Sequence, residues 1–172
     1  MIKHYTEGEL QAQLKELKII IDRREKVNDH IVKLFEQKGI QTIDRNLDVG
    51  DYACQLGDKT FEHDFAIERK ANLDEICGNL TTDRDRFERE FLRARAHGNT
   101  KLFLLIENSS WEDILSHNYQ SKFKPLSLIA SLLSWQVRFN LTIIMCKKET
   151  SAKIIYDTLY YAAREVMLYG DR

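Results

Sequence analysis

Gly50-Asp51 is followed, across an expected hairpin, by Phe65-Ala66-Ile67-Glu68-Arg69-Lys70 and then by Asp74. The apolar start of the second segment predicts a strand, and side chains two apart on a strand share a face. Glu68 and Lys70 therefore lie together, while Arg69 points to the opposite face. A lysine and two carboxylates gathered by neighbouring strands are typical of a metal-dependent hydrolase site.

Each part of this pattern is common by itself. Glu-x-Lys also occurs at Glu16-Leu17-Lys18 and Glu36-Gln37-Lys38, and a second Gly-Asp pair stands at Gly57-Asp58 in an expected turn. The signal comes from the combination, together with Asp22 at the end of the apolar run Lys18–Asp22. Taken singly, Glu68 and Lys70 are explained as a surface ion pair, Asp22 as a polar strand end and Asp51 as a turn acid.

The composition is that of an ordinary globular domain. The chain has 172 residues, of which 43% are hydrophobic and 31% charged, and a net charge of −1. DNA affinity would therefore depend on a local basic patch rather than on the overall charge. Three separated cysteines favour a reducing compartment. With no secretory signal and no run of about 20 apolar residues, we expect a cytoplasmic protein that does not enter a membrane.

Periodicity predicts alternating helices and strands. Helices are expected at 6–17, 28–38, near 74, 83–97, 111–117, 125–140 and 150–169. Strands are expected at 18–22, 40–46, 51–56, 64–69, 101–107 and 141–145. This order predicts an α/β fold with a mixed central β-sheet flanked by helices. We expect one domain over 1–172, with an N-terminal helix (6–17), a motif core (18–107) and C-terminal helices with the last strand (110–169).

A family resemblance rests on two motifs. Asp22-Arg23-Arg24-Glu25 fits Asp-x-Arg-Glu, and the opening stretch fits Gly-Asp-x(n)-Glu-Arg-Lys-x(3)-Asp. The chain thus resembles the nuclease domain of the XPF family, a branch of the restriction-endonuclease-like PD-(D/E)xK superfamily. The resemblance implies a restriction-endonuclease-like core and Mg²⁺- or Mn²⁺-dependent cleavage of DNA. It also implies that Asp22, Asp51 and Glu68 surround the metal with Lys70 beside them, and that Arg24, Arg69 and Asp74 support catalysis.

The residue chemistry assigns roles within that site. Mg²⁺ favours one or two carboxylates and keeps several waters, so Asp51 and Glu68 are the first choices as ligands. Asp22 binds directly, through water or at a second metal. Neighbouring carboxylates raise the pKa of Lys70, which favours an orienting and electrostatic role over that of a base. Arg69 alternatively pairs with Asp74 or Glu75, and Asp74 is alternatively an acid in the first turn of a helix.

The expected helix over 83–97 carries a basic stripe. Arg86, Arg89, Arg93 and His97 lie close to one face and would track phosphates, with Arg23 and Arg24 as further candidate DNA contacts. The alternative is a solvated helix with Asp85–Arg89 and Arg86–Glu90 ion pairs. His63 is better explained as a surface residue than as a metal ligand. Trp111 and Trp135 are better explained by core or interface packing than by stacking on bases.

Three functions compete. The first is a metal-dependent DNA endonuclease, with structure selectivity left open. The second is a catalytically silent DNA-binding or scaffolding subunit, and the third is a hydrolase of small phosphoesters. The resemblance implies a homodimer, supported by the apolar face of the last helix. The sequence shows no Gly-rich hairpin of the helix-hairpin-helix kind, so a separate subunit would target the DNA. Such a lone nuclease domain suits a prokaryotic or phage setting, or the nucleus of a eukaryote.

Overall fold

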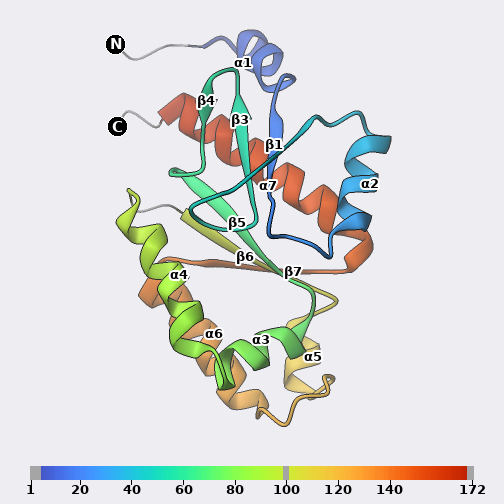
Figure 1. The fold of residues 1–172 in the computed structure, drawn as a ribbon, viewed down its shortest axis with the longest axis vertical. Helices are drawn as coiled ribbons and strands as arrows, with labels where there is room; N and C mark the ends of the chain where they lie inside the picture. The colour runs from blue at the N-terminus through green and yellow to red at the C-terminus, as the bar shows by residue number, and fades with distance from the viewer. Residues whose placement is uncertain (1–4, 99–100, 170–172) are drawn as a thin grey trace.

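A computed structural model describes residues 5–98 and 101–169 of the chain (Figure 1). The strands are β1 (Lys18–Asp22), β2 (Thr42–Arg45), β3 (Tyr52–Leu56), β4 (Lys59–Thr60), β5 (Phe65–Lys70), β6 (Lys101–Glu107) and β7 (Thr142–Cys146). The helices are α1 (Glu7–Leu14), α2 (Asp29–Gln37), α3 (Leu73–Thr81), α4 (Arg84–Ala96), α5 (Trp111–Leu115), α6 (Pro125–Phe139) and α7 (Lys148–Tyr169).

The strands form one mixed sheet in the order β2-β1-β3-β5-β6-β7, with β4 paired to β3 outside this path. Strand β3 is antiparallel to both β1 and β5, whereas the pairs β1–β2, β5–β6 and β6–β7 are parallel. Parallel neighbours need helical crossovers, which the intervening helices provide. The predicted α/β class with a mixed central sheet is confirmed.

Helices cover both faces of the sheet (Figure 1). Ala66 and Leu104 project into one buried cluster with α3, α4 and α6. Ile67 and Leu105 project into the other, which α1, α2 and α7 complete. This alternation follows from the two-residue period of a strand and sends Glu68 toward α4. Trp135 lies in the first cluster, edge-on to Phe87 and Phe91, which confirms its expected packing role.

The expected boundaries hold to within a few residues, and the differences have local causes. The capping box of Thr6 and Glu9 starts α1, which ends at Leu14 rather than at 17 because a tight turn then leads into β1. Strand β2 is shorter than the expected 40–46. Helix α7 begins two residues early, at Lys148. Asn28 directly precedes α2, but its side chain makes no capping hydrogen bond.

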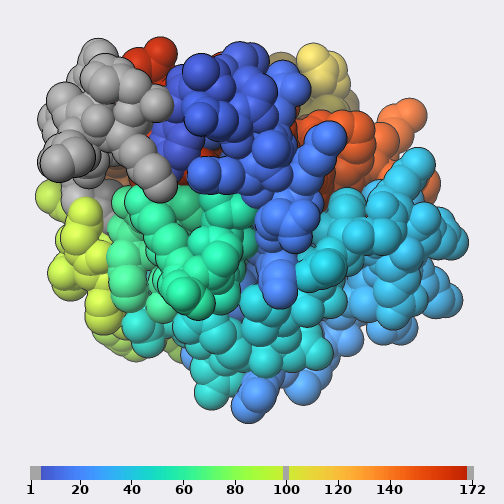
Figure 2. All heavy atoms as spheres, turned by 90° about the horizontal axis from the view of Figure 1, so that it is seen from above, coloured from blue at the N-terminus to red at the C-terminus, as the bar shows by residue number. Residues whose placement is uncertain are grey.

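The surface seen from above shows α1 beside the β3–β4 hairpin, with α2 toward the right of the view (Figure 2). Helix α7 crosses the sheet beneath α1 and carries the buried residues Ile155, Leu159 and Ala163. The last helix therefore closes the core on this face of the sheet. Among the described residues, no helix combines the length and the apolarity that crossing a membrane requires.

Candidate active site

Gly50 allows the tight approach that places Asp51. Its φ angle is +73°, and a Cβ there would lie 2.8 Å from the main-chain oxygen of Ile67. A side chain at this position would therefore be strained both by its conformation and by contact with β5. The N–H of Asp51 donates to the same Ile67 oxygen at 2.7 Å. Glycine is needed here so that Asp51 can sit directly against β5.

The carboxylate of Asp51 is fixed by the motif strand itself. The main-chain N–H of Arg69 donates to Oδ2 of Asp51 at 2.7 Å. On the α4 side of the same strand, Nζ of Lys70 donates to Oε1 of Glu68 at 2.9 Å and lies 3.6 Å from Oε1 of Glu75. The ammonium group also sits over the ring of Phe87, 4.7 Å from its centroid. Glu68 and Lys70 therefore lie together on one face of β5, as the two-residue period of a strand predicts.

The acids are held in an environment that disfavours their charge. Burial raises the pKa of Asp51 well above its usual range, and the neighbouring charge of Glu68 raises it further. Burial likewise raises the pKa of Glu68, although Lys70 opposes the shift. Burial lowers the pKa of Lys70, but the combined attraction of Glu68, Glu75 and Asp51 outweighs it, so that pKa lies above its ordinary value. Lys70 is therefore a stable cation.

Arg69 points to the opposite face of β5, as predicted, but its partners are not the expected ones. Its guanidinium donates to Glu25 at 2.6 Å and to Glu107 at 2.8 Å, rather than pairing with Asp74 or Glu75. The carboxylate of Glu107 is fully buried and also lies 2.8 Å from Nε2 of His30. Hydrogen bonds from Arg69, Ser151 and His30 outweigh burial and lower the pKa of Glu107. This network anchors the strand that holds Asp51.

Glu107 and His30 were missed by the sequence interpretation. The available signal for Glu107 was a single acid ending the apolar run Lys101–Glu107. Strand β6 is parallel to β5 and pairs Ile106 with Lys70, so both strands deliver polar residues to the same edge of the sheet. Glu25 was part of the second motif, but its pairing with Arg69 depends on sheet order, which the sequence does not state.

The main chain of Asp22 pairs with that of Asp51, but the carboxylate of Asp22 is already hydrogen-bonded to other residues. The N–H of Asp22 donates to the oxygen of Asp51 at 2.8 Å. Its side chain accepts bonds from the Arg24 guanidinium at 2.8 Å and from the N–H of Leu47 at 2.7 Å. Burial raises its pKa, but these hydrogen bonds lower it more. Asp22 therefore braces the segment that leads to Gly50.

A cavity of about 260 Å³ opens above the motif strand. It is lined by Arg24, Asp48, Val49, Gly50, Asp51, Glu68, Lys70, Arg86, Glu90 and Arg93. Of the expected site residues, the structure thus brings together Asp51, Glu68, Lys70, Arg24, Arg86 and Arg93. The others lie outside this lining, namely Asp22, Arg23, Arg69, Asp74 and Arg89.

Asp74 and Arg23 make contacts of other kinds. Oδ1 of Asp74 accepts a bond of 2.6 Å from the N–H of Ser121 and so anchors the segment before α6. Nε of Arg23 donates to the main-chain oxygen of Asp44 at 3.3 Å, and the side chain is exposed.

The basic stripe on α4 continues from the cavity along the surface. Arg86 and Arg89 line two further depressions of about 550 and 500 Å³, and Arg93 lines the larger one. Ion pairs on this helix are not the expected Asp85–Arg89 and Arg86–Glu90, but Arg84–Glu88 at 3.0 Å and Arg93–Glu90 at 3.6 Å. We call the surface lined by Arg86, Arg89 and Arg93 the arginine groove.

Comparisons with known proteins agree with this geometry. The ERCC4 domain family model matches residues 21–158, and no curated protein is similar enough to match. Two solved structures are similar in fold. XPF from Aeropyrum pernix is 20% identical, with a TM-score of 0.64 over 90% of this chain and 64% of that one. XPF from Aeropyrum pernix in complex with DNA is 18% identical, with a TM-score of 0.62 over 86% of this chain and 65% of that one.

The fold is therefore that of an XPF-type nuclease domain. The chain belongs to the ERCC4 domain family, and the predicted resemblance to the XPF family is confirmed. It spans about two thirds of the length of the two XPF chains it matches.

Proposed function

We propose that the chain is a metal-dependent DNA endonuclease that hydrolyses phosphodiester bonds. The observation that carries the proposal is the pair Asp51 and Glu68 in one cavity, with Lys70 bonded to Glu68 at 2.9 Å. Family membership supports it, as does the similarity in fold to an XPF structure in complex with DNA.

The donor set fits a hard divalent cation. Two carboxylates share the cavity, and their raised pKa values mean that one nearby lysine does not offset their burial and mutual repulsion. Asp51 and Glu68 would hold Mg²⁺ or Mn²⁺, which favour carboxylate and water oxygens. Bound there, the ion would neutralise charge on the phosphoryl oxygens and make a coordinated water more acidic. Asp22, whose carboxylate is occupied by Arg24 and Leu47, is better assigned as a positioning residue.

The remaining residues have roles that do not require a proton to move. Lys70 keeps its charge because its pKa is raised, so it orients the attacking water or stabilises negative charge in the transition state. Arg24 lines the cavity while holding Asp22. Arg86 and Arg93 line the same cavity from α4 and would bind the phosphates on either side of the scissile bond.

A catalytically silent DNA-binding subunit is the competing function. Such a protein would need the arginine groove but not two acids whose burial disfavours their charge. The proposal is tested with labelled duplex, flap, fork and single-stranded DNA, incubated with Mg²⁺, with Mn²⁺ and with chelator. We expect cleavage that requires the metal. Tight binding without cleavage of any substrate in either metal would instead support the silent subunit.

The dimer belongs to the same proposal. The apolar face of α7 is largely buried in the core, whereas α6 exposes Leu126, Leu133 and Val137 at 79%, 46% and 88%. Their spacing of seven and four residues places them on one side of α6. We therefore assign the homodimer contact to α6, and a monomeric mass by light scattering would contradict that assignment.

A further inference from the structure

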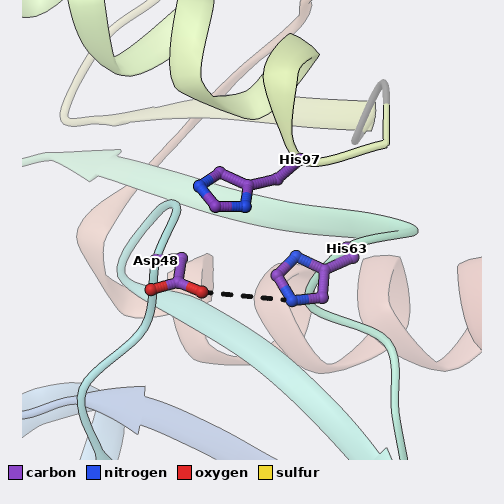
Figure 3. A group of neighbouring side chains, drawn as sticks. All are labelled: Asp48, His63 and His97. Atoms are coloured by element: carbon purple, nitrogen blue, oxygen red, sulfur yellow. Dashed lines mark ion pairs between the residues drawn. The ribbon is translucent and has the colours of Figure 1, made fainter.

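A second group of metal-ligating side chains lies on the surface and shares one member, Asp48, with the lining of the cavity that holds Asp51 and Glu68. Asp48, His63 and His97 each offer one ligand atom, and these atoms all lie within 4.8 Å of one another. Figure 3 shows the two imidazole rings one above the other with the Asp48 carboxylate beside them. We propose that this Asp48–His63–His97 cluster binds a divalent transition-metal ion of the Zn²⁺ type.

Three separate segments supply the ligands. Asp48 lies between β2 and β3, His63 between β4 and β5, and His97 caps the C-terminus of α4. The segments are brought close by packing, since a Cβ at Gly98 would lie 3.8 Å from the main-chain oxygen of His63. The histidines are 34 residues apart in sequence, so a search for short-range ligand spacing does not find them.

The donor chemistry selects the class of ion. Two imidazole nitrogens and one carboxylate oxygen suit Zn²⁺ and its neighbours in the transition series, whereas Mg²⁺ prefers oxygen donors alone. Three protein ligands leave a coordination position for water, as in open zinc sites. All three side chains are exposed, so an ion can reach them from solvent. The ion expected here therefore differs in kind from the one proposed for Asp51 and Glu68.

The present side-chain arrangement needs only local adjustment. The rings of His63 and His97 are stacked, with centroids 5.5 Å apart and planes inclined by 19°. Imidazole lone pairs lie in the ring plane, so both rings must turn to face a common ion, which their exposure permits. Nε2 of His63 lies 4.0 Å from Asp48 and 3.4 Å from Glu62. Glu62 is a competing partner of His63, although it is also paired with Arg45.

Binding would connect two parts of the nuclease. Asp48 precedes Gly50 by two residues and Asp51 by three. It also lines the cavity that holds Asp51 and Glu68. His97 ends the helix that carries the arginine groove. An ion held by Asp48, His63 and His97 would therefore fix α4 against the segment that positions Asp51, and it would stabilise the folded chain by preferential binding.

The test begins with a Co²⁺ titration, in which binding is followed by visible absorption. Calorimetry then measures the affinity for Zn²⁺. Thermal unfolding with and without Zn²⁺ measures the stabilisation that the ion provides. We expect one strong site in the wild type, retained in Asp51→Asn/Glu68→Gln, which removes the proposed catalytic ligands. His117→Gln is the matched control, because His117 is an exposed histidine outside the cluster. It should bind as the wild type does.

His63→Gln and His97→Gln should each weaken Zn²⁺ binding by more than about tenfold, because even residues that only support a metal ligand change affinity by 10–100-fold. Both variants should also lose the rise in unfolding temperature caused by Zn²⁺. If a histidine variant does not fold, Asp48→Asn replaces it in the same assays. Wild-type affinity in the folded ligand variants, or a wild type that binds no Co²⁺ at this cluster, would overturn the proposal.

Discussion

The main-chain N–H of Arg69 donates to the carboxylate of Asp51, while the side chain of Arg69 is held by Glu25 and Glu107 on the other face of the sheet. Arg69 thus connects the cavity that holds Asp51 and Glu68 to a buried ion-pair network. The position of Asp51 consequently depends on residues that do not line the cavity. Replacements on either side of β5 should therefore have separable effects on stability and on metal-dependent activity.

Replacing Arg69 should strongly destabilise the fold. Removing one partner of a buried ion pair leaves an uncompensated charge, which costs about 3–5 kcal/mol. We expect Arg69→Met to lower the free energy of unfolding in urea by an amount of this order. Adding Glu107→Gln should restore part of the loss. The control is Arg84→Met, which removes a half-exposed arginine from Glu88. It should cost under about 1 kcal/mol, because Glu88 keeps its hydrogen bonds from Trp135 and Arg138. Equal effects of the two single variants would contradict the anchoring role.

Gly50→Ala separates contact from backbone conformation. Both Gly50 and Gly57 have positive φ angles, +73° and +56°. A Cβ added at Gly50 would lie 2.8 Å from the main-chain oxygen of Ile67, which is too close. A Cβ added at Gly57 would have no neighbouring atom within 4 Å. Gly57→Ala should therefore cost about 1–2 kcal/mol from conformation alone. Gly50→Ala should cost more in urea unfolding and should also impair cleavage. The reverse order of stabilities would show that the approach of Gly50 to β5 does not matter.

Asp51 should make the metal-free protein less stable as the pH rises. Its pKa is raised in the folded state, so the folded chain binds more protons than the unfolded chain above the ordinary range near 4. The contribution is fully present below that range and is lost as the pH rises through the raised pKa. In chelator, Asp51→Asn should unfold at a higher temperature than the wild type near pH 8, and the difference should vanish near pH 4. A constant difference across this range would contradict the pKa shift.

The arginine groove predicts a change in the salt dependence of DNA binding. Each neutralised phosphate contributes about 0.9 to the slope of log K against log salt concentration. The variant Arg86→Gln/Arg89→Gln/Arg93→Gln should therefore reduce the slope by about 2–3 and weaken binding to all sequences. Arg95→Gln, on the same helix but outside the groove, is the control. An unchanged slope in the triple variant would exclude the groove as a DNA contact.

The sequence predicted the residues of one face of β5 better than those of the other. The motif and the two-residue period of a strand were enough to place Glu68 and Lys70 together and to turn Arg69 away. The partners of Arg69 were predicted wrongly, because Glu107 becomes its neighbour only when β6 pairs with β5 in parallel.

Asp22 shows a different limit of sequence reasoning. The apolar run Lys18–Asp22 placed it correctly at the end of β1, where its N–H donates to the main-chain oxygen of Asp51. The motif did not predict that Leu47 and Arg24 would donate hydrogen bonds to its carboxylate. These bonds depend on the path of the chain between β2 and β3. Similarly, Asp48, His63 and His97 come from three segments whose proximity follows only from packing.

The most direct measurement is Mg²⁺-dependent cleavage by Asp51→Asn and Glu68→Gln, alongside DNA binding in chelator and a circular dichroism spectrum. Asp58→Asn is the matched control, since Asp58 follows Gly57 as Asp51 follows Gly50 but is exposed in a turn. We predict that both site variants remain folded and bind DNA but lose cleavage, while Asp58→Asn cleaves as the wild type does. Cleavage at the wild-type rate by folded Asp51→Asn and Glu68→Gln would contradict the assignment of the active site.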